Sequence, residues 1–326
     1  MQWRNATAVV SIAIACLSGH ASAQDWPTRP LTLVVPFAAG GGVDTTARAF
    51  TPRLSEVLGQ PLVVENVGGG GGMVGGARVA KATPDGYQLM MGTAGTHAIN
   101  QTLHKRPLYN SATDFAPAGI AAHSFLVLIA RSDLPPNTLP EFVAYAKANA
   151  SRMQYASAGT GSSTHVACLI LNNAMGVTIT HVSYRGTAMA MQDLFAGRID
   201  YICEPISTAL PHIRGGTVKA ITSLGPHRTS VLPALATAAE QGLPSATTTS
   251  WLGFFFPRET PRVVVQRFSR ALHDTLETPS VQARLASLGL VSASPEERTP
   301  EFAATFVPAE IEKWGRPIKA SGISAD

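Results

Sequence analysis

The sequence predicts an α/β protein with two lobes that are connected by two crossing segments. Segments of strand and helix character alternate along the chain, which is the pattern of a sheet with helices on its faces. The pattern restarts after Ala122, and helical spacing returns after an apolar run at Trp251–Phe256. We therefore predict a first lobe of residues 24–124 plus 251–326 and an inserted second lobe of residues 125–250. A single large doubly wound domain is the alternative.

The first lobe begins with a clear strand pattern. Leu31–Val35 is apolar except for Thr32 and ends at Pro36, which is typical of a strand buried on both faces. The spacing of apolar residues predicts a helix over Asp44–Leu58, interrupted at Pro52 and closed by Gly59. Strands at 62–64 and 87–91 and a helix at 73–81 complete this part.

The second lobe repeats this alternation with shorter elements. The predicted helices span 139–150, 164–175 and 187–195, and Gly176 and Gly197 close the last two. The predicted strands span 153–156, 178–182, 199–203 and 218–222. The crossing strands are Phe125–Ala130 and Trp251–Phe256, and two crossings form a hinge that can close around a ligand. Helices at 263–276, 281–288 and 302–314 return to the first lobe.

The N-terminus has the three parts of a secretory signal peptide. Arg4 supplies positive charge, Ala6–Leu17 is an apolar run, and Ala21-Ser22-Ala23 supplies small residues before a cleavage site at Gln24. The apolar run is shorter than the roughly 20 residues that span a bilayer. We therefore predict that residues 1–23 are removed and that the mature protein is soluble in the periplasm.

Composition excludes several classes of partner. Hydrophobic residues make up 45% of the 326 residues and charged residues 14%, which is not the composition of a disordered chain. The formal net charge of +4 is spread along the sequence, without the basic and aromatic clusters of a nucleic-acid-binding protein. Cys168 and Cys203 can form a disulfide in an oxidising compartment, but buried free thiols are the more common arrangement and are our expectation.

Three glycine-rich or hydroxyl-rich loops each lead into a predicted helix. They are Pro36–Gly42, followed by Asp44 and Thr45; Ser157–His165; and Tyr184–Thr187. A helix N-terminus presents unpaired N–H groups and partial positive charge, and glycine lets a ligand approach the backbone. One such loop alone is ordinary turn chemistry. Loops of this kind in both lobes predict a site that holds an anion from two sides.

Enzymatic motifs are absent or incomplete. Gly70–Gly75 fits G-x-G-x-x-G, but the acidic residue that a dinucleotide site needs about 20 positions later is missing. No G-x-S-x-G elbow is present. Ser162 and Ser163 are more typical of helix N-cap residues than of nucleophiles that are activated by His165. The histidines lack metal-ligand spacing. We expect no catalysis, no metal and no cofactor.

Glu204 is the one acidic candidate for the site. It ends an apolar strand and precedes Pro205, so a carboxylate there can face the cleft and accept a hydrogen bond from an amino or amide group of a ligand. A capping role or a structural ion pair is equally compatible with the sequence, because perturbed acids mark sites only in a statistical sense.

Several motifs together resemble the Bug family, the TctC-type extracytoplasmic solute receptors of tripartite tricarboxylate transporters. The matching segments are Pro36-Phe37 with Gly40-Gly41 and Asp44, Asn66 with its glycine run, Thr83–Tyr87, Tyr155–His165, His181–Gly186, Gln192–Leu194 with Gly197–Asp200, and Trp314 with Lys319–Ile323. The resemblance extends from Trp26 to Ile323. It implies a two-lobed periplasmic binding protein, type II-like, that acts as a monomer and closes on a dicarboxylate, amino acid or aromatic acid.

The resemblance and the loops give one set of expected ligand-binding residues. They are Phe37, Ala38, Ala39, Gly40, Gly41, Asp44, Thr93, Thr96, His97, Ser157, Gly159, Thr160, Gly161, Ser162, Thr164, His165, Arg185, Gly186 and Glu204. The resemblance assigns backbone donors to the first and second loops and a lining role to Thr93–His97. The expected partners are a small anionic ligand and either the membrane subunits of the transporter or a sensor. An exported serine hydrolase is the rival function.

Overall fold

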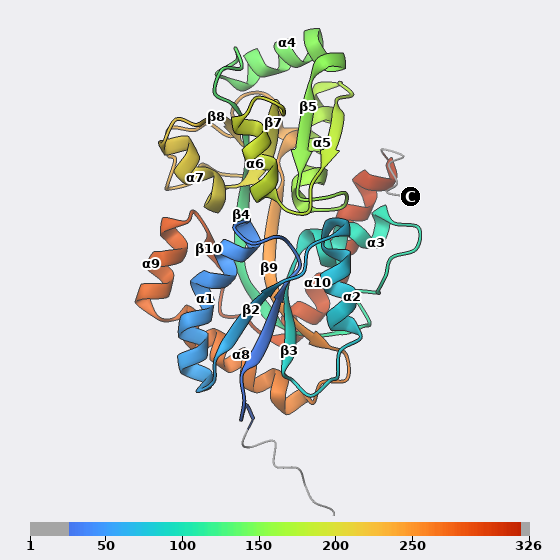
Figure 1. The fold of residues 1–326 in the computed structure, drawn as a ribbon, viewed down its shortest axis with the longest axis vertical. Coiled ribbons are helices and arrows are strands. Elements are labelled where there is room, and N and C mark those ends of the chain that lie inside the picture. The colour runs from blue at the N-terminus through green and yellow to red at the C-terminus, as the bar shows by residue number, and fades with distance from the viewer. Residues whose placement is uncertain (1–25, 321–326) are drawn as a thin grey trace, which may run out of the picture.

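The structure, a computed structural model, describes residues 26–320. The predicted signal peptide and the last part of the tail motif lie outside the described residues. Figure 1 shows two lobes stacked along the long axis of the molecule, with β4 and β9 running between them. Within residues 26–320, no helix has both the length and the apolar composition that a membrane span requires.

The strands form one continuous pairing path in the order β2-β1-β3-β9-β4-β7-β5-β6, and β8 and β10 also pair with β4. The strands are β1 Leu31–Val35, β2 Leu62–Asn66, β3 Gln88–Thr93, β4 Phe115–Arg131, β5 Gln154–Ser157, β6 Thr180–Ser183, β7 Tyr201–Pro205, β8 Val218–Ser223, β9 Thr249–Pro257 and β10 Val291–Ser292. The helices are α1 Gly42–Leu58, α2 Met73–Ala80, α3 Asn100–Leu103, α4 Leu139–Asn149, α5 Ser163–Met175, α6 Thr187–Phe195, α7 Ile206–Arg214, α8 Arg262–Leu276, α9 Pro279–Ser287 and α10 Pro300–Ala320.

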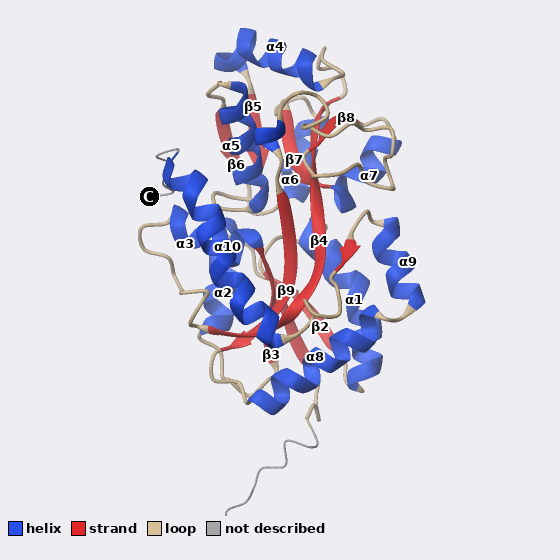
Figure 2. Ribbon diagram, turned by 180° about the vertical axis from the view of Figure 1, so that it is seen from behind, coloured by secondary structure: helices blue, strands red, loops and turns tan. Residues whose placement is uncertain are grey.

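Each lobe has a parallel sheet with apolar packing on both faces. In the first lobe β1 pairs in parallel with β2 and β3, and its alternate side chains enter two separate cores: Leu33 packs with α1 and α8, and Val34 with α2 and α10. In the second lobe β5 pairs in parallel with β6 and β7. Its cores lie on the α4 and α5 face and on the α6 and α7 face. Figure 2 shows helices on both sides of the strands.

The two crossing strands are antiparallel and belong to both lobes. β4 pairs with β9 from Phe115↔Pro257 to Phe125↔Thr249, and its second half pairs with β7 and β8. β4 begins ten residues before the predicted strand, in a stretch whose alanine, glycine and proline have low strand propensity. The predicted lobe boundaries, 124/125 and 250/251, fall inside β4 and β9, where the strands are continuous, and they stay a prediction.

Helix positions follow the sequence pattern with two informative differences. α1 continues through Pro52, so the expected interruption does not occur. α7 was not predicted, because proline stands at its N-cap and again at Pro211 inside it. Both helices are amphipathic and bury one face, and this tertiary packing outweighs the local cost of proline.

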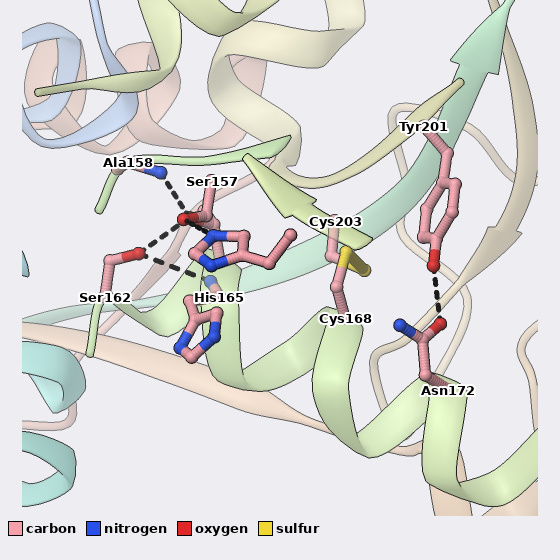
Figure 3. The surroundings of a disulfide bond; sticks show 10 residues. Ser157, Ala158, Ser162, His165, Cys168, Asn172, Tyr201 and Cys203 are labelled. Atoms are coloured by element: carbon pink, nitrogen blue, oxygen red, sulfur yellow. Dashed lines mark hydrogen bonds between the residues drawn. A yellow bond between two sulfur atoms is a disulfide. The ribbon is translucent and has the colours of Figure 1, made fainter. Parts of the chain in front are cut away.

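Cys168 and Cys203 form a disulfide, which corrects the expectation of two free thiols. α5 packs against β7 so that the two residues face each other with their Cα atoms 5.4 Å apart. Figure 3 shows the bond beside the contact of Tyr201 with Asn172, whose hydrogen bond measures 2.6 Å. The sequence left open whether this bond forms, because helix-to-strand packing and not chain distance brings the two residues together.

We predict that this disulfide contributes about 4 kcal/mol to the free energy of unfolding, because it closes a segment of 35 residues in the unfolded chain. Urea unfolding of residues 24–326 with and without dithiothreitol measures the difference. Thiol titration in denaturant should find no free thiol before reduction. Two reactive thiols in the oxidised protein would contradict the bond.

Candidate ligand-binding site

A cavity lies between the lobes. Both lobes and both crossing strands contribute to its wall. The lining residues are Phe37, Gly41, Gly42, Val43, Thr46, Thr93, Ser124, Leu126, Ala158, Ser162, Ser163, Thr164, Thr187, Pro205, Ser250 and Leu252. None of these side chains is charged.

Four helices begin at this cavity. Gly42 is the first residue of α1, Ser163 of α5 and Thr187 of α6, and Pro205 is the N-cap of α7. The first N–H groups of a helix have no acceptor within the helix, and each N-terminus carries roughly half a positive charge. No side chain caps α1, α6 or α7. These helix starts therefore contribute partial positive charge to the cavity wall.

Hydroxyl groups supply the remaining polarity of the wall. Eight of the lining residues are serine or threonine. Ser124, on β4, is buried, and its Oγ has no hydrogen-bond partner. An unpaired buried hydroxyl costs stability, and this one lies where a bound molecule would be able to satisfy it.

Some residues of the first predicted loop line the cavity, and others stabilise the loop itself. Phe37 and Gly41 line the cavity, whereas Ala39 and Gly40 are exposed. Asp44 points back into its own loop, where its carboxylate accepts hydrogen bonds from Gly40 N, the Arg48 side chain and the Asn66 side chain. Burial alone would raise the pKa of Asp44, but these hydrogen bonds outweigh it and hold the pKa below its usual value. Asp44 thus fixes the entry to α1.

The second predicted loop uses its own backbone donors internally. Ala158 N donates to Thr164 Oγ1, Gly159 N to Ser157 Oγ, and Gly161 N to His165 Nδ1. Figure 3 shows Ser157, Ala158, Ser162 and His165 gathered at the start of α5. Thr160 N donates to Ser183 Oγ and Ser162 N to Gly159 O. Of the predicted residues in this loop, Ser162 and Thr164 line the cavity, and the others shape the turn behind it.

A cluster of aromatic rings packs next to that loop. The His165 and His181 rings lie 4.2 Å apart, and His181 lies 4.9 Å from Tyr155. Burial, with the neighbouring His181, lowers the pKa of His165 to about 3, and burial lowers that of His181 to about 4. Both rings are therefore neutral at pH 7, and His165 Nδ1 can accept the Gly161 hydrogen bond.

The Thr93–His97 segment contributes one residue to the wall. Thr93 lines the cavity, and the Thr96 hydroxyl accepts a hydrogen bond from Thr93 N. His97 is fully buried in the first lobe, 3.8 Å from the ring of Phe255 in a stacked arrangement. The structure brings Thr93 to the cavity and places Thr96 and His97 behind it.

The third predicted loop contacts the opposite lobe through its backbone. Ala38 N donates to the carbonyl of Arg185 at 3.3 Å. A Cβ atom added at Gly186 would lie 2.7 Å from Ala38 Cβ. The Arg185 side chain is exposed and does not line the cavity. This loop therefore holds the two lobes together at the rim.

Glu204 lies directly behind the wall. Its Oε1 accepts hydrogen bonds from the hydroxyls of Thr187, at 2.8 Å, and Thr208, while Oε2 is buried without a partner. Burial raises the pKa of Glu204 from 4.5 to about 7, against the two threonine hydrogen bonds, which lower it. Within residues 26–320, Glu204 forms neither an ion pair nor a hydrogen bond that caps a helix. It contacts the cavity through Thr187.

Sequence reasoning missed the part of the wall that the crossing strands supply. Ser124, Leu126, Ser250 and Leu252 come from β4 and β9, and Thr46 comes from α1. The predicted crossing strands could have indicated these wall residues, because any strand shared by two lobes must border the space between them. In the described part of the chain, no group of three His, Cys, Asp or Glu side chains could hold a metal ion.

Two α/β lobes joined by two crossing strands, with one cavity lined by both, define a two-lobed binding protein. The family model described as tripartite tricarboxylate transporter family receptor matches residues 46–323, and the chain belongs to this family. The family and its solved structures are binding proteins, and so the chain is a binding protein and not an enzyme.

Three solved structures show the likeness. The periplasmic binding protein BugD is 35% identical, with a TM-score of 0.89, over 92% of this chain and 99% of that one. MatC from Rhodopseudomonas palustris, with bound malate, is 38% identical, with a TM-score of 0.86, over 89% and 99%. An R. palustris protein with adipate is 32% identical, with a TM-score of 0.87, over 92% and 99%.

We predict that Glu204 makes stability depend on pH between about 4.5 and 7. A carboxyl group whose pKa is higher in the folded protein contributes stability that is complete below the unfolded pKa and is lost as the pH rises through the folded pKa. The unfolding free energy of Glu204→Gln relative to wild type should rise by about 3 kcal/mol between pH 4.5 and pH 8. Urea unfolding across this range measures it.

The matched control is Glu240→Gln, on an exposed carboxyl group whose pKa is lowered by hydrogen bonds from Thr237 and Arg228. That variant should show no relative gain with rising pH. A constant difference between wild type and Glu204→Gln from pH 4.5 to 8 would contradict the raised pKa.

Proposed function

We propose that this protein is a periplasmic receptor that binds a small carboxylate between its lobes and delivers it to the membrane subunits of a tripartite tricarboxylate transporter. One observation carries the proposal: four helix N-termini meet at a cavity whose wall contains no charged side chain. Membership of the receptor family and the malate and adipate in similar structures support the same ligand class.

A carboxylate matches this cavity in charge and in hydrogen bonding. It is acceptor-only, and the first turns of α1 and α5 offer donors at Gly42, Val43, Ser163 and Thr164. Hydrogen bonds to a charged acceptor are worth roughly 1.5–3 kcal/mol each. Because the amides of the Ser157–Ser162 turn are already used, we assign that turn to support and the donors to the helix starts.

Ser124 gives the ligand a contact on the crossing strand. Its buried Oγ lacks a partner in the structure and lies on the cavity wall. A carboxylate oxygen would accept this hydrogen bond. The contact would also link the ligand to β4, which both lobes share.

The lobes are proposed to close around the ligand by bending at β4 and β9. Close interlobe contacts support this: Gly95 N donates to Ser163 Oγ at 3.1 Å, and a Cβ at Gly71 would lie 2.0 Å from Thr160 O. We place the receptor in the periplasm because residues 1–23 have the pattern of a signal peptide.

We predict that isothermal titration calorimetry of residues 24–326, unfolded and refolded to remove bound molecules, will detect binding of at least one acid from a panel that includes malate, succinate, adipate, aspartate and benzoate. Ser124→Ala should weaken binding about 10-fold, because one hydrogen bond to a charged group is lost. Failure of every carboxylate in the panel to bind would refute the proposed ligand class.

Ser269→Ala is the matched control. Ser269 is also buried, but its hydroxyl donates to Arg298 O in the first lobe, away from the cavity lining. This variant should lose stability and keep ligand affinity. Equal affinities in wild type and Ser124→Ala would remove Ser124 from the site.

We predict that Gly71→Ala will weaken ligand binding at least 10-fold, because the new methyl group collides with Thr160 of the other lobe. Gly59→Ala is the control, since Gly59 has a similar positive φ of 73° but no atom within 4 Å of an added Cβ. Both variants should lose about 1 kcal/mol of stability. Calorimetry with the best ligand of the panel tests this, and equal affinities of the two variants would argue against closure at this contact.

A further inference from the structure

The pair Thr187 and Glu204 fixes the direction of one hydrogen bond in the cavity wall. Thr187 is the first residue of α6, lines the cavity and is buried. Its Oγ1 donates to Glu204 Oε1 at 2.8 Å. Glu204 is fully buried, and its Oε1 accepts this hydrogen bond both in the carboxylate form and when the unpartnered Oε2 carries a proton.

A threonine hydroxyl has a single hydrogen, so Thr187 has only lone pairs left to offer the cavity. Other hydroxyl groups of the wall can still donate their hydrogen to a ligand. Ser163 Oγ accepts hydrogen bonds from Gly95 N and Ser250 Oγ, which leaves its hydrogen free, and the Ser124 hydroxyl has no partner. The wall therefore combines donors for a carboxylate with one fixed acceptor.

The acceptor lies next to the donors at the start of α1. A Cβ atom added at Gly41, the N-cap of α1, would be 3.4 Å from Thr187 Oγ1. A carboxylate bound to the first amides of α1 would therefore have its neighbouring carbon within reach of Thr187. A carboxylate oxygen would find no side-chain donor at Thr187, because its hydroxyl hydrogen is directed to Glu204.

Resting on the proposed carboxylate-binding function, we propose that this site selects acids that carry a hydrogen-bond donor, a hydroxyl or an ammonium group, on the carbon beside the carboxylate, and that Thr187 accepts this hydrogen bond while Glu204 orients it. Glu204 is a positioning residue, because it reaches the ligand only through Thr187. The same acid without the donor leaves the Thr187 lone pairs buried and unpaired, which costs affinity.

Calorimetry with matched pairs of acids tests this selection. The pairs are malate with succinate, 2-hydroxyglutarate with glutarate, and mandelate with phenylacetate, and aspartate compared with malate separates an ammonium from a hydroxyl donor. For whichever pair binds, the donor-bearing acid should bind wild type about 5- to 10-fold more tightly. Equal affinities within the bound pairs would overturn the inference and leave carboxylate binding intact. Absence of binding by every acid would refute the proposed function itself.

Two pairs of variants test whether Thr187 and Glu204 produce the preference for acids that carry a donor. Thr187→Val should reduce the affinity ratio within a pair to about 1, whereas Thr187→Ser, which keeps the hydroxyl, should retain the wild-type ratio. Glu204→Met removes the acceptor that orients Thr187 and should also reduce the ratio. Glu204→Gln retains a carbonyl acceptor and should preserve it.

The affinity ratio is insensitive to a general loss of stability, because both acids of a pair are measured on the same variant. A wild-type affinity ratio in Thr187→Val would show that another group accepts the hydrogen bond from the ligand. It would overturn the assignment of this role to Thr187. An unchanged ratio in Glu204→Met would remove Glu204 from the selection.

Discussion

The proposed site depends on the N-terminal ends of α1, α5, α6 and α7, which all begin at one cavity between the lobes. In the proposed function, partial positive charge from helix ends attracts an anion without a buried arginine or lysine, whose desolvation would be costly in the empty receptor. The neighbouring turns serve this arrangement. Asp44 secures the entry to α1, and the internally bonded Ser157–Ser162 turn secures the entry to α5.

The sheet explains how the helix ends can act together and still belong to separate lobes. Each lobe contains its own parallel strands and its own pair of cores, whereas β4 and β9 pass through both lobes. A strand pair is stiff along its length and can twist, which suits a connection between two compact bodies. The Cys168–Cys203 disulfide ties α5 to β7 within the second lobe, so it stiffens that lobe without linking it to the first.

The residues expected from the sequence to bind a ligand include some that line the cavity and some that the structure places behind it. The sequence located the loops before α1, α5 and α6, and the cavity is lined by Phe37, Gly41, Ser162 and Thr164 from the expected set. It did not separate side chains of the wall from those behind it, such as His97, because burial depends on neighbours from distant segments. Ser124 and Ser250 were missed for the same reason, since their importance comes from the pairing of β4 with β9.

Local signals were sufficient for what depends on local chemistry: the alternation of strands and helices, the glycine turns at helix starts and the restart that marks a second lobe. The tertiary structure alone decided which groups meet across large sequence separations. It joined Cys168 to Cys203, packed the ring of His165 against that of His181, and set Glu204 behind Thr187. The physical reason is that periodicity and turn propensity act over a few residues, whereas hydrogen-bond direction and burial in the cavity are set by packing between elements that the chain order does not place together.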